Sequence, residues 1–178
     1  EVWKLGEMGA KILKPGDVFH TMKYPLPPGV FGGGWIYGMA GGMASIGLVV
    51  GLDYKDPTLD PHNLFQKFKQ HRFLRSILGD GELLHYGAKT IPDGGYFAMP
   101  KLTADGVMLI GDTAGTLNVP KIKGTHQAMR GGMIAAEHIA RTNSVAGFDT
   151  ALRASPVVAE LKKVRNIKPG FHGGLWMG

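Results

Sequence analysis

The chain has 178 residues, of which 44% are hydrophobic and 19% are charged, so its composition allows a packed core and excludes wholesale disorder. Its formal net charge of +6 comes from basic residues that are spread along the chain, which favours a solvated basic surface and gives a nucleic-acid partner little support. Because it has no cysteine, the chain cannot by itself form disulfides, thiolate metal sites or the ligand set of an iron–sulfur cluster.

Both ends of the sequence break off abruptly. Glu1 begins the chain without a Met or a signal peptide, and residues 173–178 are apolar with no polar tail. We therefore expect this chain to be a piece of a longer protein.

Residues 24–52 carry no charge, and a stretch of this length is long enough to span a bilayer. Many glycines interrupt it, however, and each one weakens a helix. The better prediction is a β-hairpin, with strands at 35–37 and 46–50 joined by a turn at 40–42.

Two helices are predicted after the hairpin. Asp60 followed by Pro61 is typical of a helix start, and Gly79 closes a second, shorter helix. The apolar positions recur at helical spacing and are expected to be core residues rather than cofactor contacts: Leu64, Phe65, Phe68, Leu74, Ile77 and Leu78.

Strands are predicted next, over 83–91 and 96–102, around a glycine-rich turn at 92–95. A short buried strand is predicted over 106–111. A helix over 125–141 follows, with small residues that would let it pack close to a sheet, and then a weaker helix over 148–164 that Pro156 breaks.

The loop between the last predicted strand and the 125–141 helix has the composition of a binding loop. Asp112 follows a strand, where a carboxylate can accept hydrogen bonds from ribose or sugar-alcohol hydroxyls. Gly115 and Gly124 permit close approach of a ligand to the backbone, and a helix that begins near Thr125 directs free N–H groups and positive dipole at whatever lies before it. From spacing alone, an ordinary Asp cap on a strand-to-helix turn is an equally good account.

The wider stretch resembles a known family. Residues 117–126, Leu-Asn-Val-Pro-Lys-Ile-Lys-Gly-Thr-His, closely resemble the electron transfer flavoprotein–ubiquinone oxidoreductases. The resemblance continues, in order and over nearly the whole chain, at 47–54 with Pro57, 85–88, 94–96, 100–102 and 164–169.

This resemblance implies an α+β or α/β fold: a fragment of a glutathione-reductase-like FAD domain with an inserted β-sheet quinone-binding domain. Residues 1–104 would belong to the quinone-binding domain, 105–142 to the returning FAD domain and 143–178 to a linker toward an iron–sulfur domain. The family passes electrons from reduced electron transfer flavoprotein, through FAD and a four-iron four-sulfur cluster, to ubiquinone in the respiratory chain. Its members bind one face of a membrane, so a bacterial or mitochondrial inner membrane is the implied location.

For the FAD, the resemblance places Gly111 and Asp112 at the ribityl chain and Asn118 near the isoalloxazine ring. Gly124 and Thr125 would present backbone N–H groups to the pyrimidine end of the flavin. Many family members have another residue at position 112, whereas related flavoproteins keep the acid. The alternative role for Asn118 is that of a simple turn residue.

For the quinone, Gly32 and Gly33 align with a glycine pair whose backbone would bond a quinone carbonyl. Phe31 and Gly34 depart from the Tyr and Ser that the family commonly has there. The alternative is that these glycines only form a bend at a sheet edge. No catalytic acid or base is expected, because the reaction is electron transfer.

The remaining expectations concern what this chain lacks. Its histidines have no ligand spacing, so no metal site is predicted. The N-terminal glycine loop that binds the ADP half of FAD and the cluster cysteines would lie outside it, so the piece alone should be inactive. Two rivals remain: a cluster-free flavin-dependent reductase or monooxygenase, such as a prenyl reductase, and a non-enzymatic membrane-surface module.

Overall fold

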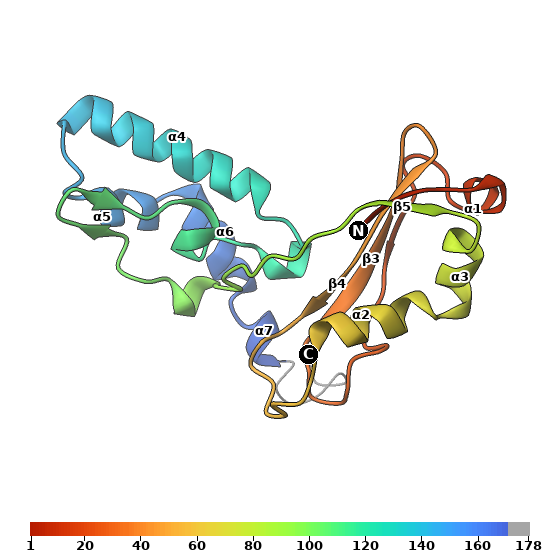
Figure 1. The fold of residues 1–178 in the computed structure, drawn as a ribbon. Coiled ribbons are helices and arrows are strands. Elements are labelled where there is room, and N and C mark those ends of the chain that lie inside the picture. The colour runs from red at the N-terminus through yellow and green to blue at the C-terminus, as the bar shows by residue number, and fades with distance from the viewer. Residues whose placement is uncertain (171–178) are drawn as a thin grey trace. The chain divides into compact units, whose positions relative to one another are not determined.

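The computed structural model of the chain describes residues 1–170 (Figure 1). Two compact units follow one another in the sequence, Glu1–Ala88 and Lys89–Gly178. The chain contains both helices and strands, and the main sheet is antiparallel, which agrees with the expected α+β class. The domain boundaries expected at residues 104 and 142 refer to the domains of the full-length protein, and they stay a prediction.

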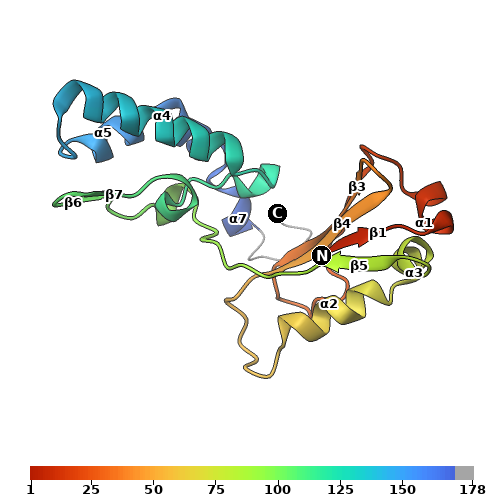
Figure 2. The same cartoon turned by 45° about the horizontal axis from the view of Figure 1, so that its top comes forward.

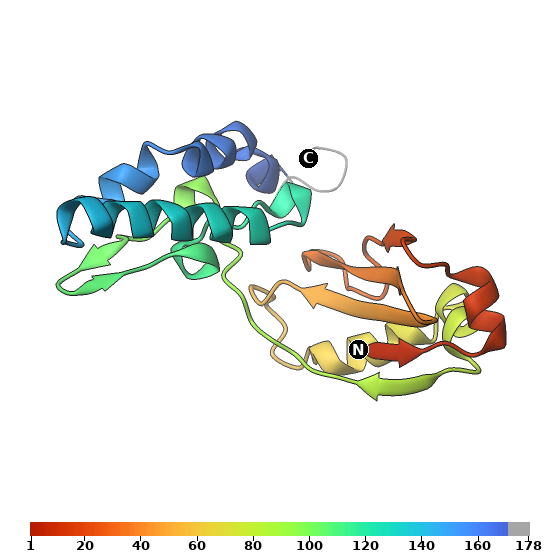
Figure 3. The same cartoon turned by 90° about the horizontal axis from the view of Figure 1, so that it is seen from above.

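The first unit is a five-stranded antiparallel sheet with helices on it. The strand order is β2-β3-β4-β1-β5. The strands are β1 (Val2–Lys4), β2 (Val18–His20), β3 (Gly32–Met39), β4 (Met43–Val50) and β5 (Glu82–His85), and the helices are α1 (Glu7–Ile12), α2 (Pro61–Lys69) and α3 (Arg72–Leu78). Helices α2 and α3 cover one face of the sheet (Figures 2 and 3), where Ile36 and Ile46 pack with Phe68, Leu74 and Ile77 in a buried cluster.

The predicted hairpin is confirmed. Strands β3 and β4 pair in register from Gly32↔Val50 to Met39↔Met43. The turn contains Gly41 and Gly42, both with positive φ (+74° and +67°), a conformation that glycine adopts without steric cost. No helix in the described residues is long and apolar enough to cross a membrane.

Both predicted helices of the first unit are also confirmed. Asp60 caps α2, since its carboxylate accepts hydrogen bonds from the backbone N–H groups of His62 and Asn63, and Pro61 occupies the first turn. Helix α3 ends at Gly79.

The strand predictions after residue 82 were partly wrong. Of the predicted strand over 83–91, only the first part is a strand (β5, Glu82–His85), and within the one predicted over 96–102, residues 96–98 form a short 3₁₀ helix, η1 (Tyr96–Ala98). The cause lies in Gly95, whose N–H bonds to the Gly115 carbonyl and whose own carbonyl accepts from Ala98, so the chain turns here. The predicted buried strand over 106–111 is a two-residue strand, β7 (Val107–Met108), paired with β6 (Thr103–Ala104), and Val107 is 51% exposed.

Helices dominate the second unit. The elements after β7 are η2 (Gly111–Ala114), η3 (Val119–Lys121), α4 (Thr125–Thr142), α5 (Phe148–Arg153), α6 (Pro156–Val164) and α7 (Ile167–Gly170). The break at Pro156 and the start of α4 at Thr125 are confirmed. Figure 3 shows α4 running beside the α5–α6 segment, and these helices enclose a core around Phe148, Leu152 and Val157. Within the described residues α4 therefore packs on helices, not on the expected sheet.

Candidate functional site

The loop that leads into α4 folds back on itself through two glycines. Gly111 and Gly115 have φ values of +63° and +73°, and the Thr116 hydroxyl donates to the Gly111 carbonyl at 2.9 Å. This turn brings the start of the loop against the first residues of α4, because a Cβ on Gly111 would lie 3.3 Å from the Ala128 Cβ. The expected strand–loop–helix arrangement is therefore present.

Asp112 and Gly124 come together across this loop. A Cβ on Gly124 would lie 2.7 Å from Oδ1 of Asp112, so any larger residue at position 124 would clash with that oxygen. The same Oδ1 is buried, and no donor among residues 1–170 bonds to it. Burying a carboxylate oxygen without a hydrogen-bond donor costs free energy of folding. A ligand hydroxyl or N–H group that donates to this oxygen would remove that cost, so the oxygen is a candidate ligand contact.

The first turn of α4 lies at the same place. Gly124 is its N-cap residue and provides no side-chain hydrogen bond to the first turn. Helix α4 has 18 residues, so the N–H groups around Thr125 carry the positive end of a long helix dipole. Among the sequence-predicted cofactor residues, the structure thus brings together Gly111, Asp112, Gly124 and Thr125.

Gly115 lies beside another glycine pair. Its carbonyl accepts from Gly95, and its Cα approaches Gly94. A cavity of about 190 Å³ borders this contact and is lined in part by Leu117, Val119 and Arg165. Gly115 therefore shapes the loop by close backbone contact.

Asn118 is completely buried, and its side chain is engaged within the protein. Its Oδ1 accepts from the Lys121 N–H at 3.2 Å, and its Nδ2 donates to Oε1 of Glu160 at 2.7 Å. Its backbone also bonds in both directions with Lys123, which closes a tight loop. A role as a turn residue is therefore visible in the structure, and these two bonds leave one amide N–H and one lone pair of Oδ1 unused.

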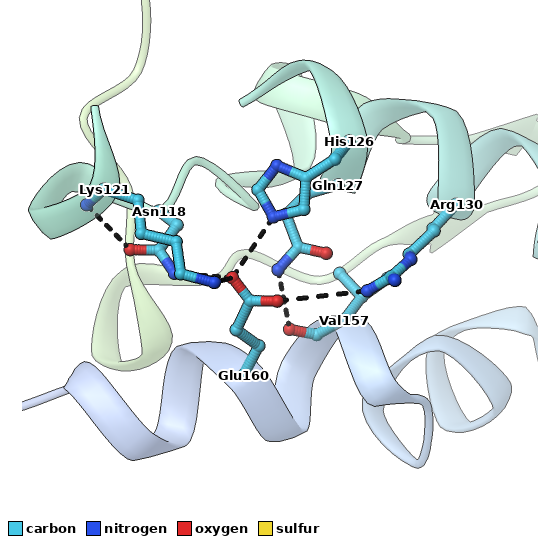
Figure 4. A network of polar contacts seen from close by, with 7 residues as sticks. All are labelled: Asn118, Lys121, His126, Gln127, Arg130, Val157 and Glu160. Carbon is cyan, nitrogen blue, oxygen red and sulfur yellow. Dashed lines mark hydrogen bonds and ion pairs between the residues drawn. The ribbon is translucent and has the colours of Figure 1, made fainter. Parts of the chain in front are cut away.

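The sequence reasoning missed Glu160. Figure 4 shows its carboxylate, on α6, at the centre of a polar network, with Lys121 Nζ at 2.8 Å and His126 Nε2 at 3.1 Å from Oε1. Arg130 approaches Oε2 at 3.9 Å. One sequence signal existed: after Asp149, Glu160 is the single acidic residue in an otherwise basic stretch.

The electrostatics of Glu160 follow from these contacts. Its side chain is 19% exposed, so water competes only partly with the donors. The hydrogen bonds from Lys121, His126 and Asn118 lower the pKa of the Glu160 carboxyl from 4.5 to about 2, against an opposing effect of burial. The carboxylate is therefore ionised at any physiological pH.

The predicted quinone glycines lie in β3 of the first unit, where the surrounding backbone gives them a structural reason. A Cβ on Gly33 would overlap the Thr21 carbonyl, and one on Gly32 would overlap the Val49 carbonyl. Gly32 also has a φ of +147°. Close packing of neighbouring strands therefore requires glycine at both positions.

The backbone directions of these glycines differ. Gly34 bonds to Thr21 on the β2 side of the strand, and bonding direction alternates along an antiparallel strand. Gly33 therefore faces β4, whereas Gly32 faces the β2 side, beyond the end of β2 at His20. Exposed apolar side chains surround this end of the sheet: Met22, Tyr24, Phe31, Val49 and Leu52.

The histidines that the structure describes bond to different partners. His20 bonds to the Tyr37 hydroxyl at 2.8 Å, and His126 bonds to Glu160. In the part of the chain that the structure describes, no group of three or more His, Cys, Asp or Glu side chains is arranged to hold a metal ion. His172 lies outside the described residues.

Comparison with known proteins gives a consistent family. Residues 1–91 match the family model described as "ETF-QO, ubiquinone-binding". The mitochondrial electron transfer flavoprotein–ubiquinone oxidoreductases of Oryza sativa subsp. japonica and Homo sapiens are 42% and 41% identical to 100% and 98% of this chain, and a probable one from Saccharomyces cerevisiae is 38% identical to 98% of it. The chain spans only 31%, 30% and 31% of these relatives' lengths, respectively. The chain therefore belongs to the electron transfer flavoprotein–ubiquinone oxidoreductase family.

Proposed function

We propose that this chain is part of an enzyme that passes electrons from reduced electron transfer flavoprotein to ubiquinone. The observation that carries the proposal is about 40% identity, over essentially the whole chain, to proteins that bear this name. The parent enzyme would contain FAD and a four-iron four-sulfur cluster, whose cysteines this chain does not supply. Its fold would be a glutathione-reductase-like FAD domain with an inserted quinone-binding domain.

The second unit would hold part of the FAD. The buried oxygen of Asp112, to which no donor among residues 1–170 bonds, fits the ribityl hydroxyls, and Gly111 lets the backbone pass close to them. The uncapped first turn at Gly124 and Thr125 fits the electron-rich pyrimidine end of the ring. The bound flavin would supply the electron-transfer chemistry, while these residues bind and orient it.

The first unit would hold the quinone. The backbone of Gly32, which faces the β2 side beyond His20, would provide a hydrogen-bonding group at an end of the sheet where apolar side chains are exposed, and a lipid-soluble quinone needs both features. The same apolar side chains suit contact with a membrane surface, which agrees with attachment to one face of an inner membrane. The relatives are named as mitochondrial proteins.

The test is made on the full-length protein encoded by the parent gene. We expect a glycine-rich Gly-x-Gly-x-x-Gly loop upstream, four clustered cysteines downstream, bound FAD, and reduction of a short-chain ubiquinone by reduced electron transfer flavoprotein. FAD without the cysteines and without this activity would instead indicate a cluster-free flavin reductase. Liposome binding without any flavin would indicate a membrane-surface module.

A further inference from the structure

We infer that Glu160 is a positioning residue that holds the 118–126 loop in the conformation that meets the flavin. The inference rests on the proposed function, because that function places this loop at the isoalloxazine ring. It concerns a residue outside the loop, on α6, that would act through Asn118, Lys121 and His126 rather than by touching the flavin.

The contacts converge on one carboxylate from three points of the loop. Oε1 of Glu160 accepts from Asn118 Nδ2 at 2.7 Å, from Lys121 Nζ at 2.8 Å and from His126 Nε2 at 3.1 Å (Figure 4). These donors lie at the start of the loop, in η3 and in the first turn of α4. A single group therefore fixes the ends and the middle of the loop relative to one another.

Few other polar contacts hold the loop. Its backbone hydrogen bonds are local, such as Ile122 to Val119 and the mutual pair of Asn118 and Lys123. Within residues 1–170, the side-chain hydrogen bonds that join the loop to another element all end at Glu160. Without the carboxylate, the loop would lose these connections, and the buried Asn118 amide would lose its acceptor.

Helix α6 is a suitable base for this contact. Val157, Val158 and Leu161, on the same helix, are buried and 1–5% exposed, so the helix is held by packing. Glu160 projects from it toward the loop (Figure 4). Groups that must position a site are more accurate when packed secondary structure carries them than when loops do.

The test compares Glu160→Gln with the wild type in the full-length protein. In the flavin-free form, amide hydrogen exchange over residues 116–127 should accelerate about tenfold or more, because hydrogen bonds to charged groups are worth that order. In the flavin-loaded form, the flavin reduction potential should shift.

The matched control is Asp149→Asn. Asp149 also carries a carboxylate in the second unit, and within residues 1–170 it accepts hydrogen bonds from Arg153 Nε at 2.9 Å and the Leu102 N–H at 3.0 Å, neither of which belongs to the 118–126 loop. This variant should change neither the loop exchange nor the potential. An equal change in both variants would overturn the inference, because it would show only a general loss of stability.

The outcomes separate this inference from the proposed function. If Asn118→Ala shifts the potential while Glu160→Gln changes neither exchange nor potential, the role of Glu160 is refuted and the loop stays at the flavin. If Glu160→Gln frees the loop while both variants keep the wild-type potential, the loop does not meet the flavin, and the placement of the flavin fails with the inference. If Glu160→Gln does not fold, Lys121→Met is the second test. The Lys121 side chain is 56% exposed, so its replacement should not prevent folding. Unchanged amide hydrogen exchange over residues 116–127 in that variant would overturn the inference.

Discussion

The pKa of Glu160 is set by contacts with residues that are distant from it in the sequence. The donors lie 34 to 42 positions away in the sequence, and together they lower the pKa of its carboxyl to about 2. A lowered folded-state pKa means that the ionised form is stabilised by folding. This contribution is complete above the ordinary value of 4.5 and is lost as the pH falls toward 2.

The pH dependence of Glu160→Gln follows from this sign. The wild-type loop should be better protected than the variant loop above about pH 5, and the difference should shrink as the pH falls through about 2, where the wild-type carboxyl becomes protonated. The measurement is the amide hydrogen-exchange protection factor of each residue from 116 to 127, calculated against the exchange rate of an unstructured chain at the same pH. A difference that stays constant from pH 6 to pH 2 would contradict the assignment.

Leu52 offers a test of the proposed quinone site that does not disturb the glycines. It is 60% exposed, directly after Gly51, whose N–H bonds to the Phe31 carbonyl at the Gly32 end of the sheet. In the full-length enzyme, Leu52→Gln should raise the KM for quinone several-fold, since about one apolar side chain's contact is lost, while flavin content stays unchanged. Met8→Gln, at an equally exposed position on α1, is the control and should leave the KM unchanged.

Substitution of Gly33 itself would be uninformative about quinone. A Cβ there overlaps the Thr21 carbonyl, so even Gly33→Ala should force β2 and β3 apart and cost roughly 1–3 kcal/mol, as overpacked sites do. Loss of quinone turnover in such a variant would report the strand distortion. Substitution of an exposed side chain near Gly32, such as Leu52, separates loss of quinone binding from strand distortion.

At the scale of elements, glycines inside a helix and inside a strand should respond in opposite ways. A Cβ on Gly132, within α4, meets nothing within 4 Å, so Gly132→Ala should stabilise the second unit by about 0.5–1 kcal/mol through helix propensity. A Cβ on Gly38, within β3, would overlap the Lys14 carbonyl, so Gly38→Ala should destabilise the first unit. Urea denaturation of the two variants measures the change in the free energy of unfolding and so checks both predictions. A destabilising Gly132→Ala would show that other atoms pack against this face of α4.

The element boundaries show where sequence patterns succeed. The hairpin and α2 depend on local signals, namely turn glycines and an Asp-Pro start, and these were predicted correctly. The segment 96–102 was predicted as a strand from its residue types, but the contact between Gly95 and Gly115 turns it into a 3₁₀ helix. A contact between residues 20 positions apart is not encoded in any local pattern.

On the scale of the whole molecule, residues 1–170 form two hydrophobic cores, one in each unit. The residues between them, 86–95, are outside helices and strands, and Tyr86 is 83% exposed. Limited digestion of the 178-residue chain with chymotrypsin should therefore cut first after Tyr86 and leave two resistant products. Mass spectrometry identifies the site, and a Tyr86→Ala chain that is cut equally fast at the same segment would contradict the prediction.

The sequence by itself determined the family, the hairpin, the starts of α2 and α4 and the loop that is proposed to meet the flavin, because each depends on residues that are adjacent or regularly spaced. Only the tertiary structure decided that Asn118 is engaged by Glu160, that Asp112 faces Gly124, and that the glycines of β3 are required by neighbouring backbone. The physical reason is distance along the chain. Hydrogen bonds and close packing act over a few ångströms in space, and helix α6 and strand β2 bring their groups to these positions only when the chain folds.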